Sequence, residues 1–142
     1  MNHLERLGFV RYREISKYVL DQIERKSGYP LPSDYSEFLA YRPTAREPFA
    51  FGFMMGAKEC EGQISEFQNI APMNDDLTRL ADVVRVSGEM ALLPIGYDGA
   101  GNYLYLDLAA KGRVVDLDYE TGTISPVADS FTQLLERLKV AD

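Results

Sequence analysis

Two closely spaced glycines stand in the segment DGAGN at residues 98–102, and glycine-rich loops of that kind can hold a phosphate group. Such a loop usually adds a lysine and the start of a helix. Here no GK[ST] sequence and no third glycine follow, and Asp98 would repel a phosphate. The next residues, YLYLDL, alternate with the period of a strand. The segment is therefore predicted to be a hairpin turn with a positive φ at or near Gly101, and not a phosphate site.

Side chains that could act as a nucleophile or a base are few. His3 is the only histidine, and its place near a chain end makes it a poor base for a catalytic triad. Cys60 is the only cysteine, and it lies between Glu59 and Glu61, whose negative charges disfavour a reactive thiolate. Carboxylates are plentiful, but no pair of them stands out for acid–base chemistry. We therefore expect no catalytic residues and no enzymatic activity.

Metal and cofactor sites are also not expected. The segment DLDYETGT at residues 116–123 loosely resembles the start of a calcium loop, but it lacks the glycine at position 6 and the glutamate at position 12. One cysteine excludes a cysteine-based zinc cluster and an internal disulfide, which fits a reducing compartment. The sequence thus predicts a protein without a bound metal or cofactor.

The charge of the chain is strongly negative and unevenly distributed. The 142 residues have a formal net charge of −7. Residues 1–71 contain nine Lys/Arg against ten Asp/Glu, a balance of −1, and residues 72–142 contain six against twelve, a balance of −6. Phosphate repulsion makes such a chain a poor nucleic-acid binder, whereas a basic protein would be attracted. The charge could also serve solubility alone.

The length of the chain and its apolar segments favour one soluble domain. Domains of about 100–150 residues are the commonest, so residues 1–142 are expected to form a single domain. The charged N-terminal segment lacks the apolar centre of a signal peptide, and no apolar run is long enough for a membrane span. We expect a cytoplasmic protein that does not bind membranes.

The spacing of apolar residues predicts helices and strands in alternating groups. Helices are expected within residues 13–28, 30–43, 74–86 and 125–140, and strands at 48–56, 62–70, about 91–97, 102–108 and 113–118. In the last helix, Asp129 or Ser130 would be the cap. Its buried face would contain Phe131, Leu134, Leu135 and Leu138. This order predicts an α+β domain with a mainly antiparallel sheet.

Four segments resemble conserved motifs of the SUKH superfamily. PLPSDYSEFLAYRP is similar to its LP-x-D-Y-x-x-FL signature, and LLPIGYDGAGNYLYLDL is similar to its PI-x-D-x-x-GN-x-x-x-LD segment. GRVVDLD and VADSFTQLLERL resemble the closing strand and helix of the family. The likeness extends from about residue 15 to 139. It departs at RPTARE, where the family often has an NGG-like turn, and the middle at 55–90 matches no quoted motif.

The resemblance implies both a fold and a class of function. The fold would be a curved antiparallel sheet of about five to six strands with helices packed against it. The function would be that of an immunity protein, which binds and neutralises a bacterial toxin domain, often a nuclease. A regulatory scaffold of the same fold, without a toxin partner, is the first alternative, and a small-molecule binder or an enzyme is the second. The matched residues would be structural: Asp34 and Tyr35 open a helix, Pro94 shapes a strand, and Gly101 with Asn102 forms a turn.

The function would then depend on a surface, and the later strands contain residues suited to one. Tyrosines give contact area, and carboxylates attract a basic partner. Tyr103 and Tyr105 share a strand face with Asp107, and Asp116 shares a face with Asp118. The predicted partner-binding residues are Asp98, Tyr103, Tyr105, Asp107, Asp116, Asp118 and Glu120. Alternatively, this face is merely solvated, or a helix covers it and the tyrosines belong to a core.

Overall fold

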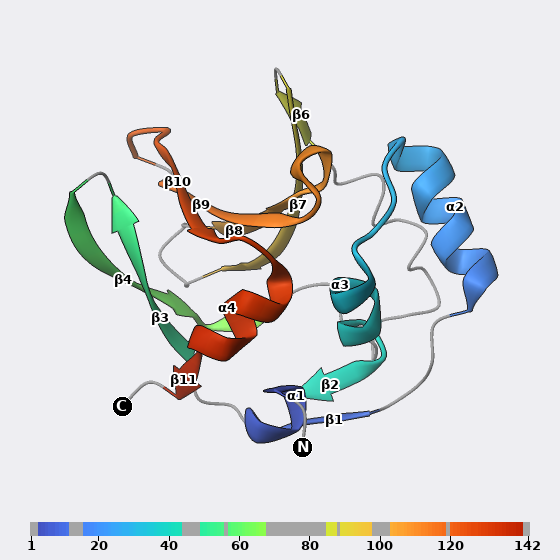
Figure 1. The fold of residues 1–142 in the computed structure, drawn as a ribbon, viewed down its shortest axis with the longest axis horizontal. Helices are drawn as coiled ribbons and strands as arrows, with labels where there is room; N and C mark the ends of the chain where they lie inside the picture. Colours follow the sequence, from blue (N-terminus) through green and yellow to red (C-terminus); the bar gives the residue numbers. More distant parts are fainter. Residues whose placement is uncertain are drawn as a thin grey trace.

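The computed structural model confirms the predicted α+β class (Figure 1). It describes residues 3–11, 16–43, 49–55, 57–67, 85–87, 89–97, 103–118 and 120–140. Its helices are α1 (His3–Arg6), α2 (Lys17–Ser27), α3 (Ser33–Phe38), α4 (Phe131–Arg137) and the short 3-10 helix η2 (Leu108–Ala110).

The largest sheet in the described part of the chain has six strands, all paired antiparallel. The order β10-β9-β8-β7-β5 runs across it, and β6 also pairs with β7. The strands are β5 (Glu66–Phe67), β6 (Arg85–Ser87), β7 (Met90–Tyr97), β8 (Tyr103–Asp107), β9 (Arg113–Leu117) and β10 (Ile124–Ala128). The three strands expected at 91–97, 102–108 and 113–118 are thus confirmed as β7, β8 and β9.

Two smaller sheets complete the described fold. One joins β11 (Lys139–Val140), β3 (Phe49–Met55) and β4 (Lys58–Ile64), and the other pairs β1 (Phe9–Arg11) with β2 (Tyr41–Pro43). The expected strand at 62–70 is wrong in its bounds, because β4 already begins at Lys58. Met55 pairs with Lys58, so only two residues separate β3 from β4. The polar sequence of β4 hid this strand, since much of it is exposed.

Capping residues fix where the helices begin and end. Ser16 accepts a hydrogen bond from the Val19 N–H at 3.2 Å and so begins α2. Gly28 ends α2 in the left-handed conformation with φ 83°, as its position after the apolar stripe predicts. Ser130 begins α4 by accepting from the Gln133 N–H at 3.1 Å, while the Gln133 side chain accepts from the Asp129 N–H.

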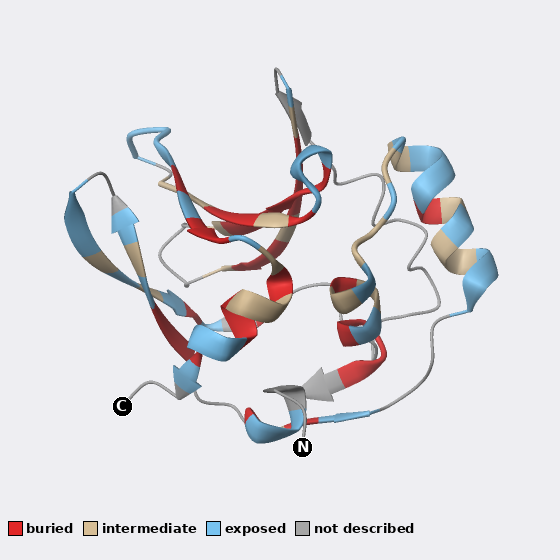
Figure 2. Ribbon diagram, in the orientation of Figure 1, coloured by how far each residue is buried: buried red, intermediate tan, exposed pale blue. Residues whose placement is uncertain are grey.

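The main core lies between the six-stranded sheet and the helices α3 and α4. Figure 2 shows buried segments concentrated in β7, β8 and β9 and on one side of α4. The Tyr35 and Phe131 rings meet edge to face, with their centroids 5.1 Å apart. The predicted buried face of the last helix is confirmed, because each of its four apolar residues is at most 5% exposed. We call the sheet face toward α4 the inner face and the opposite one the outer face.

Two predictions fall wholly or mainly outside the described residues. They are the turn at Gly101 and most of the helix within 74–86. The end of that predicted helix is wrong, because residues 85 and 86 belong to strand β6, which pairs with β7. Asp98 is also outside the described residues.

Candidate protein-binding surface

The strand register assigns the predicted surface residues to different faces of the six-stranded sheet. Directly opposed residues of an antiparallel pair share a face. Tyr103 is opposite Leu117 and Asp116 is opposite Leu104. Leu104 belongs to the main core, so Asp116 lies on the inner face, whereas Tyr103 lies on the outer face. Asp107, which is opposite Leu92, therefore shares the outer face with the tyrosines, whereas Asp116 does not.

The outer face has a small hydrophobic cluster of its own. Leu92, Tyr105 and Val115 are buried there, and the partly buried residues Met90, Tyr103 and Leu117 pack against them. Tyr105 is only 4% exposed, so most of its ring supports the sheet. Tyr103 is half-buried, and its ring centroid lies 6.1 Å from that of Tyr105. The tyrosine side chains thus form part of a second core that is partly open to solvent.

One row of apolar side chains crosses this outer face from strand to strand. Tyr97 is opposite Tyr103, Tyr103 is opposite Leu117, and Leu117 is opposite Ile124. We call these four residues the Tyr103 row. Three of them are half-buried, and Ile124 is 37% exposed. Apolar and aromatic side chains in such a row offer contact area to a partner protein.

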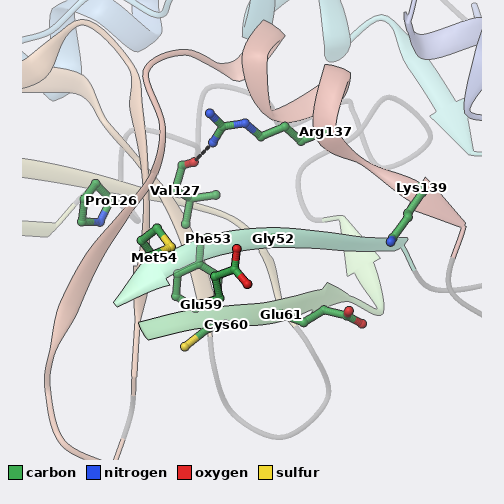
Figure 3. Close-up of a pocket in the computed structure, with 10 residues that line it drawn as sticks. All are labelled: Gly52, Phe53, Met54, Glu59, Cys60, Glu61, Pro126, Val127, Arg137 and Lys139. Carbon is green, nitrogen blue, oxygen red and sulfur yellow. Dashed lines mark hydrogen bonds between the residues drawn. The ribbon is translucent and has the colours of Figure 1, made fainter. Parts of the chain in front are cut away.

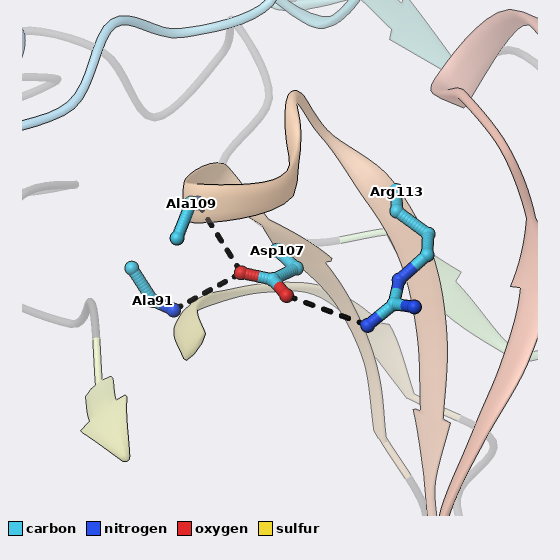
Figure 4. A network of polar contacts seen from close by, with 4 residues as sticks. All are labelled: Ala91, Asp107, Ala109 and Arg113. Atoms are coloured by element: carbon cyan, nitrogen blue, oxygen red, sulfur yellow. Dashed lines mark hydrogen bonds and ion pairs between the residues drawn. The ribbon is translucent and has the colours of Figure 1, made fainter. Parts of the chain in front are cut away.

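Asp107 is buried and has a structural role (Figure 4). Its Oδ1 accepts hydrogen bonds from the Ala91 N–H at 3.1 Å and the Ala109 N–H at 3.2 Å. Its Oδ2 lies 3.6 Å from Nη2 of Arg113. The side chain is 3% exposed, so this carboxylate is withdrawn from any partner. It connects the start of β7 to the turn between β8 and β9.

Two further predicted acids, Asp118 and Glu120, lie at the end of β9 and in the turn that leads to β10. Asp118 Oδ1 accepts from the Glu120 N–H at 3.0 Å, and the Asp118 carbonyl accepts from the Gly122 N–H at 2.8 Å. Gly122 has φ 72°, which a turn of this shape requires. Glu120 is exposed and Asp118 is half-buried. The turn that leads into Ile124 therefore presents the negative charge of Glu120 to solvent.

The sequence reasoning missed Leu117, Ile124 and strand β10 as parts of this surface. The signal was present in VVDLD, where Val115 and Leu117 alternate with Asp116 and Asp118. Pro126 obscured β10, because proline is rare in strands other than edge strands. In the structure β10 is an edge strand of the six-stranded sheet.

The described residues offer neither a metal site nor a membrane-spanning helix. No group of three or more His, Cys, Asp or Glu side chains there is arranged to hold a metal ion. None of the helices in the same part of the chain has the length and apolar character needed to cross a bilayer.

The fold defines an α+β domain built on antiparallel sheets. Compared with known protein families, the chain matches the SMI1 / KNR4 family (SUKH-1) over residues 14–137. That range covers most of the chain, so the chain belongs to this family. Family membership supports a role as a protein-interaction module. Comparisons with curated proteins and with solved structures gave no significant match.

Proposed function

We propose that this chain is a non-enzymatic immunity protein that binds a cognate toxin domain and neutralises it. The observation that carries the proposal is the Tyr103 row, on the sheet face that is turned away from the main core. Apolar side chains on that face are only partly covered by their neighbours, so a partner would remove further apolar surface from water. The family membership supports binding to a protein as the general role.

The charge of the chain favours a basic partner. The net charge is −7, and the exposed Glu120 adds negative potential in the turn that leads into Ile124 of the Tyr103 row. A nuclease domain needs a basic surface to hold its polyanionic substrate. An acidic protein can cover that surface, and opposite charges speed the encounter of the two proteins. A basic toxin domain such as a nuclease is therefore the proposed partner.

The experiment that tests this function is a protection assay in cells. Cells produce the toxin domain encoded beside the gene for this chain, together with the chain itself or a variant. The wild-type chain should restore growth, and Tyr103→Ala should weaken the protection. Tyr18→Ala is the matched control, because Tyr18 is 70% exposed on α2, outside the six-stranded sheet. No protection by the wild-type chain would contradict the immunity function and favour a regulatory scaffold of the same fold.

A further inference from the structure

A groove separates the β3–β4 hairpin from β10 and α4 (Figure 3). Its volume is about 600 Å³, which is within the usual range of ligand-binding clefts. Its apolar part includes Phe53, Met54 and Val127, and its polar part includes Glu59 and Arg137. It is a different site from the Tyr103 row, although β10 lies beside both.

Two open strand edges border this groove. β11 pairs with β3 only at residues 49 and 50, so along residues 51–55 no described strand pairs with β3 on the side away from β4. β10 pairs only with β9 among the described strands, and it lies close to β3. The Val127 carbonyl accepts a hydrogen bond from Arg137, not from a strand. Open edges of this kind can accept an extended peptide through main-chain hydrogen bonds.

Gly52 leaves space in the floor of the groove. It is exposed, and a Cβ atom built on it would meet only the Cys60 carbonyl oxygen, at 4.0 Å. Its φ is not in the positive range, so its backbone does not require glycine. Gly62, by contrast, lies under the Phe51 ring and has no room for a side chain. A side chain from a bound segment can therefore pass over Gly52 toward β4.

The carboxylates of β4 determine which charge a ligand of the groove should have. Glu59 is opposite Met54 and Glu61 is opposite Gly52, so both acids share the face that carries the open space. Both are exposed, and neither forms an ion pair within the part of the chain that the structure describes. Figure 3 shows the Glu59 side chain directed toward Val127 and the Cys60 side chain on the other side of β4.

Both cations of the groove lie away from the Glu59 end of β4, and neither forms an ion pair with Glu59 among the described residues. Arg137 donates to the Val127 carbonyl. Lys139 is opposite Ala50, which is about 14 Å along the strand from Met54, the partner of Glu59, but only about 7 Å from Gly52, the partner of Glu61. The end of the groove near the β3–β4 turn is therefore anionic.

We infer that the groove binds an extended peptide segment of a partner protein, with basic side chains at alternate positions. The segment pairs with the open edge of β3. One basic side chain passes over Gly52 to reach Glu61, and the next one reaches Glu59 beside Met54. The two acids are two residues apart on one strand, and alternate side chains of an extended peptide have the same spacing. The occupant is thus a basic extended segment and not a folded surface.

The test uses the whole chain, labelled with ¹⁵N, and two peptides with blocked ends. One peptide is Val-Lys-Val-Lys-Val and the other is Val-Glu-Val-Glu-Val. The lysine peptide should shift the amide resonances of Gly52, Met54 and Glu59 in a saturable way, and the glutamate peptide should not. Gly52→Leu should remove these shifts, because the added side chain fills the groove, while the rest of the spectrum stays as in the wild type.

A second variant removes the charges without filling the groove. The double variant Glu59→Gln, Glu61→Gln should weaken binding of the lysine peptide about fivefold, because it removes two exposed ion pairs. Asp21→Asn with Glu24→Gln makes the same charge change on exposed positions of α2 and should leave the binding unchanged. The inference is overturned if both peptides give equal shifts, if the lysine peptide gives none, or if both groove variants respond like the wild type. No toxin is needed, so this result is independent of the proposed immunity function.

Discussion

Asp34 and Thr132 join the start of α3 to the start of α4 across 98 positions of the sequence. Asp34 Oδ2 accepts hydrogen bonds from the Thr132 N–H at 2.8 Å and from its hydroxyl at 2.9 Å. Oδ1 of the same carboxylate accepts from the Tyr35 N–H at 2.8 Å. An acidic side chain is favourable at helix N-termini, where N–H groups lack partners within the helix. The aspartate of the PSDY motif is therefore structural, as expected.

Asp34→Ala should lower the free energy of unfolding by about 1–2 kcal/mol, because it removes a charged partner of two backbone N–H groups. Urea titration of the variant measures this loss. Asp21→Ala is the control, since Asp21 is an exposed acid on α2. A loss for Asp34→Ala no larger than that of the control would show that the contact does not stabilise the fold.

Gly112 and Gly122 allow backbone strain to be measured separately from a steric clash when a side chain is added. Both have positive φ, 87° and 72°. A Cβ on Gly112 would clash with Pro32 Cγ, at the start of α3, whereas nothing lies within 4 Å of a Cβ on Gly122. Gly122→Ala should cost about 1 kcal/mol of stability from backbone strain alone, and Gly112→Ala should cost clearly more. Thermal unfolding compares the two variants, and equal losses would contradict the close approach to Pro32.

Asp107→Ala should destabilise the fold without changing the binding surface. The variant leaves the buried N–H of Ala91 without its side-chain acceptor, and such a loss costs about 1–3 kcal/mol. Chemical denaturation measures that cost. For the folded protein, the affinity for the partner should match the wild type, because Asp107 is buried. If the Asp107→Ala variant is as stable as the wild type but binds the partner more weakly, Asp107 contributes to the interface.

Glu120→Lys should slow the association with a basic partner and reduce its dependence on salt. Glu120 is exposed in the β9–β10 turn, and screening of such charges sets in over about 10 Å near 0.1 M salt. Stopped-flow association rates at low and high salt measure the effect. Glu24→Lys makes the same change in net charge on the exposed side of α2. Equal rates for both variants would show that net charge alone, and not the turn, steers the partner.

Periodicity predicted the elements whose apolar faces are clear. The apolar face of α4 and the alternation of β8 were readable because one side of each element is buried. The β4 strand was placed too late, since its exposed residues Lys58, Glu59 and Glu61 are unlike those of a buried strand. Strand β10 was missed because Pro126 lies within it.

The candidate surface was predicted less completely than the fold. The pairing register between strands decides which residues lie on the same face of a sheet, and the sequence of one strand does not contain that register. The burial of Asp107 depends on the Ala91 N–H, 16 positions away. Sequence alone gives the charge of that residue but not its partners. The tyrosines were located correctly on one strand face, while their apolar neighbour Ile124 came from a strand that had not been recognised.

The affinity of Tyr103→Ala for the partner protein tests the central claim most directly. Calorimetry with the purified toxin domain gives the dissociation constants of the wild type, Tyr103→Ala and Tyr18→Ala. Removing an aromatic side chain from the middle of an interface costs about tenfold or more in affinity. The account predicts that loss for Tyr103→Ala and none for Tyr18→Ala. Wild-type affinity for a folded Tyr103→Ala variant would contradict binding through the Tyr103 row.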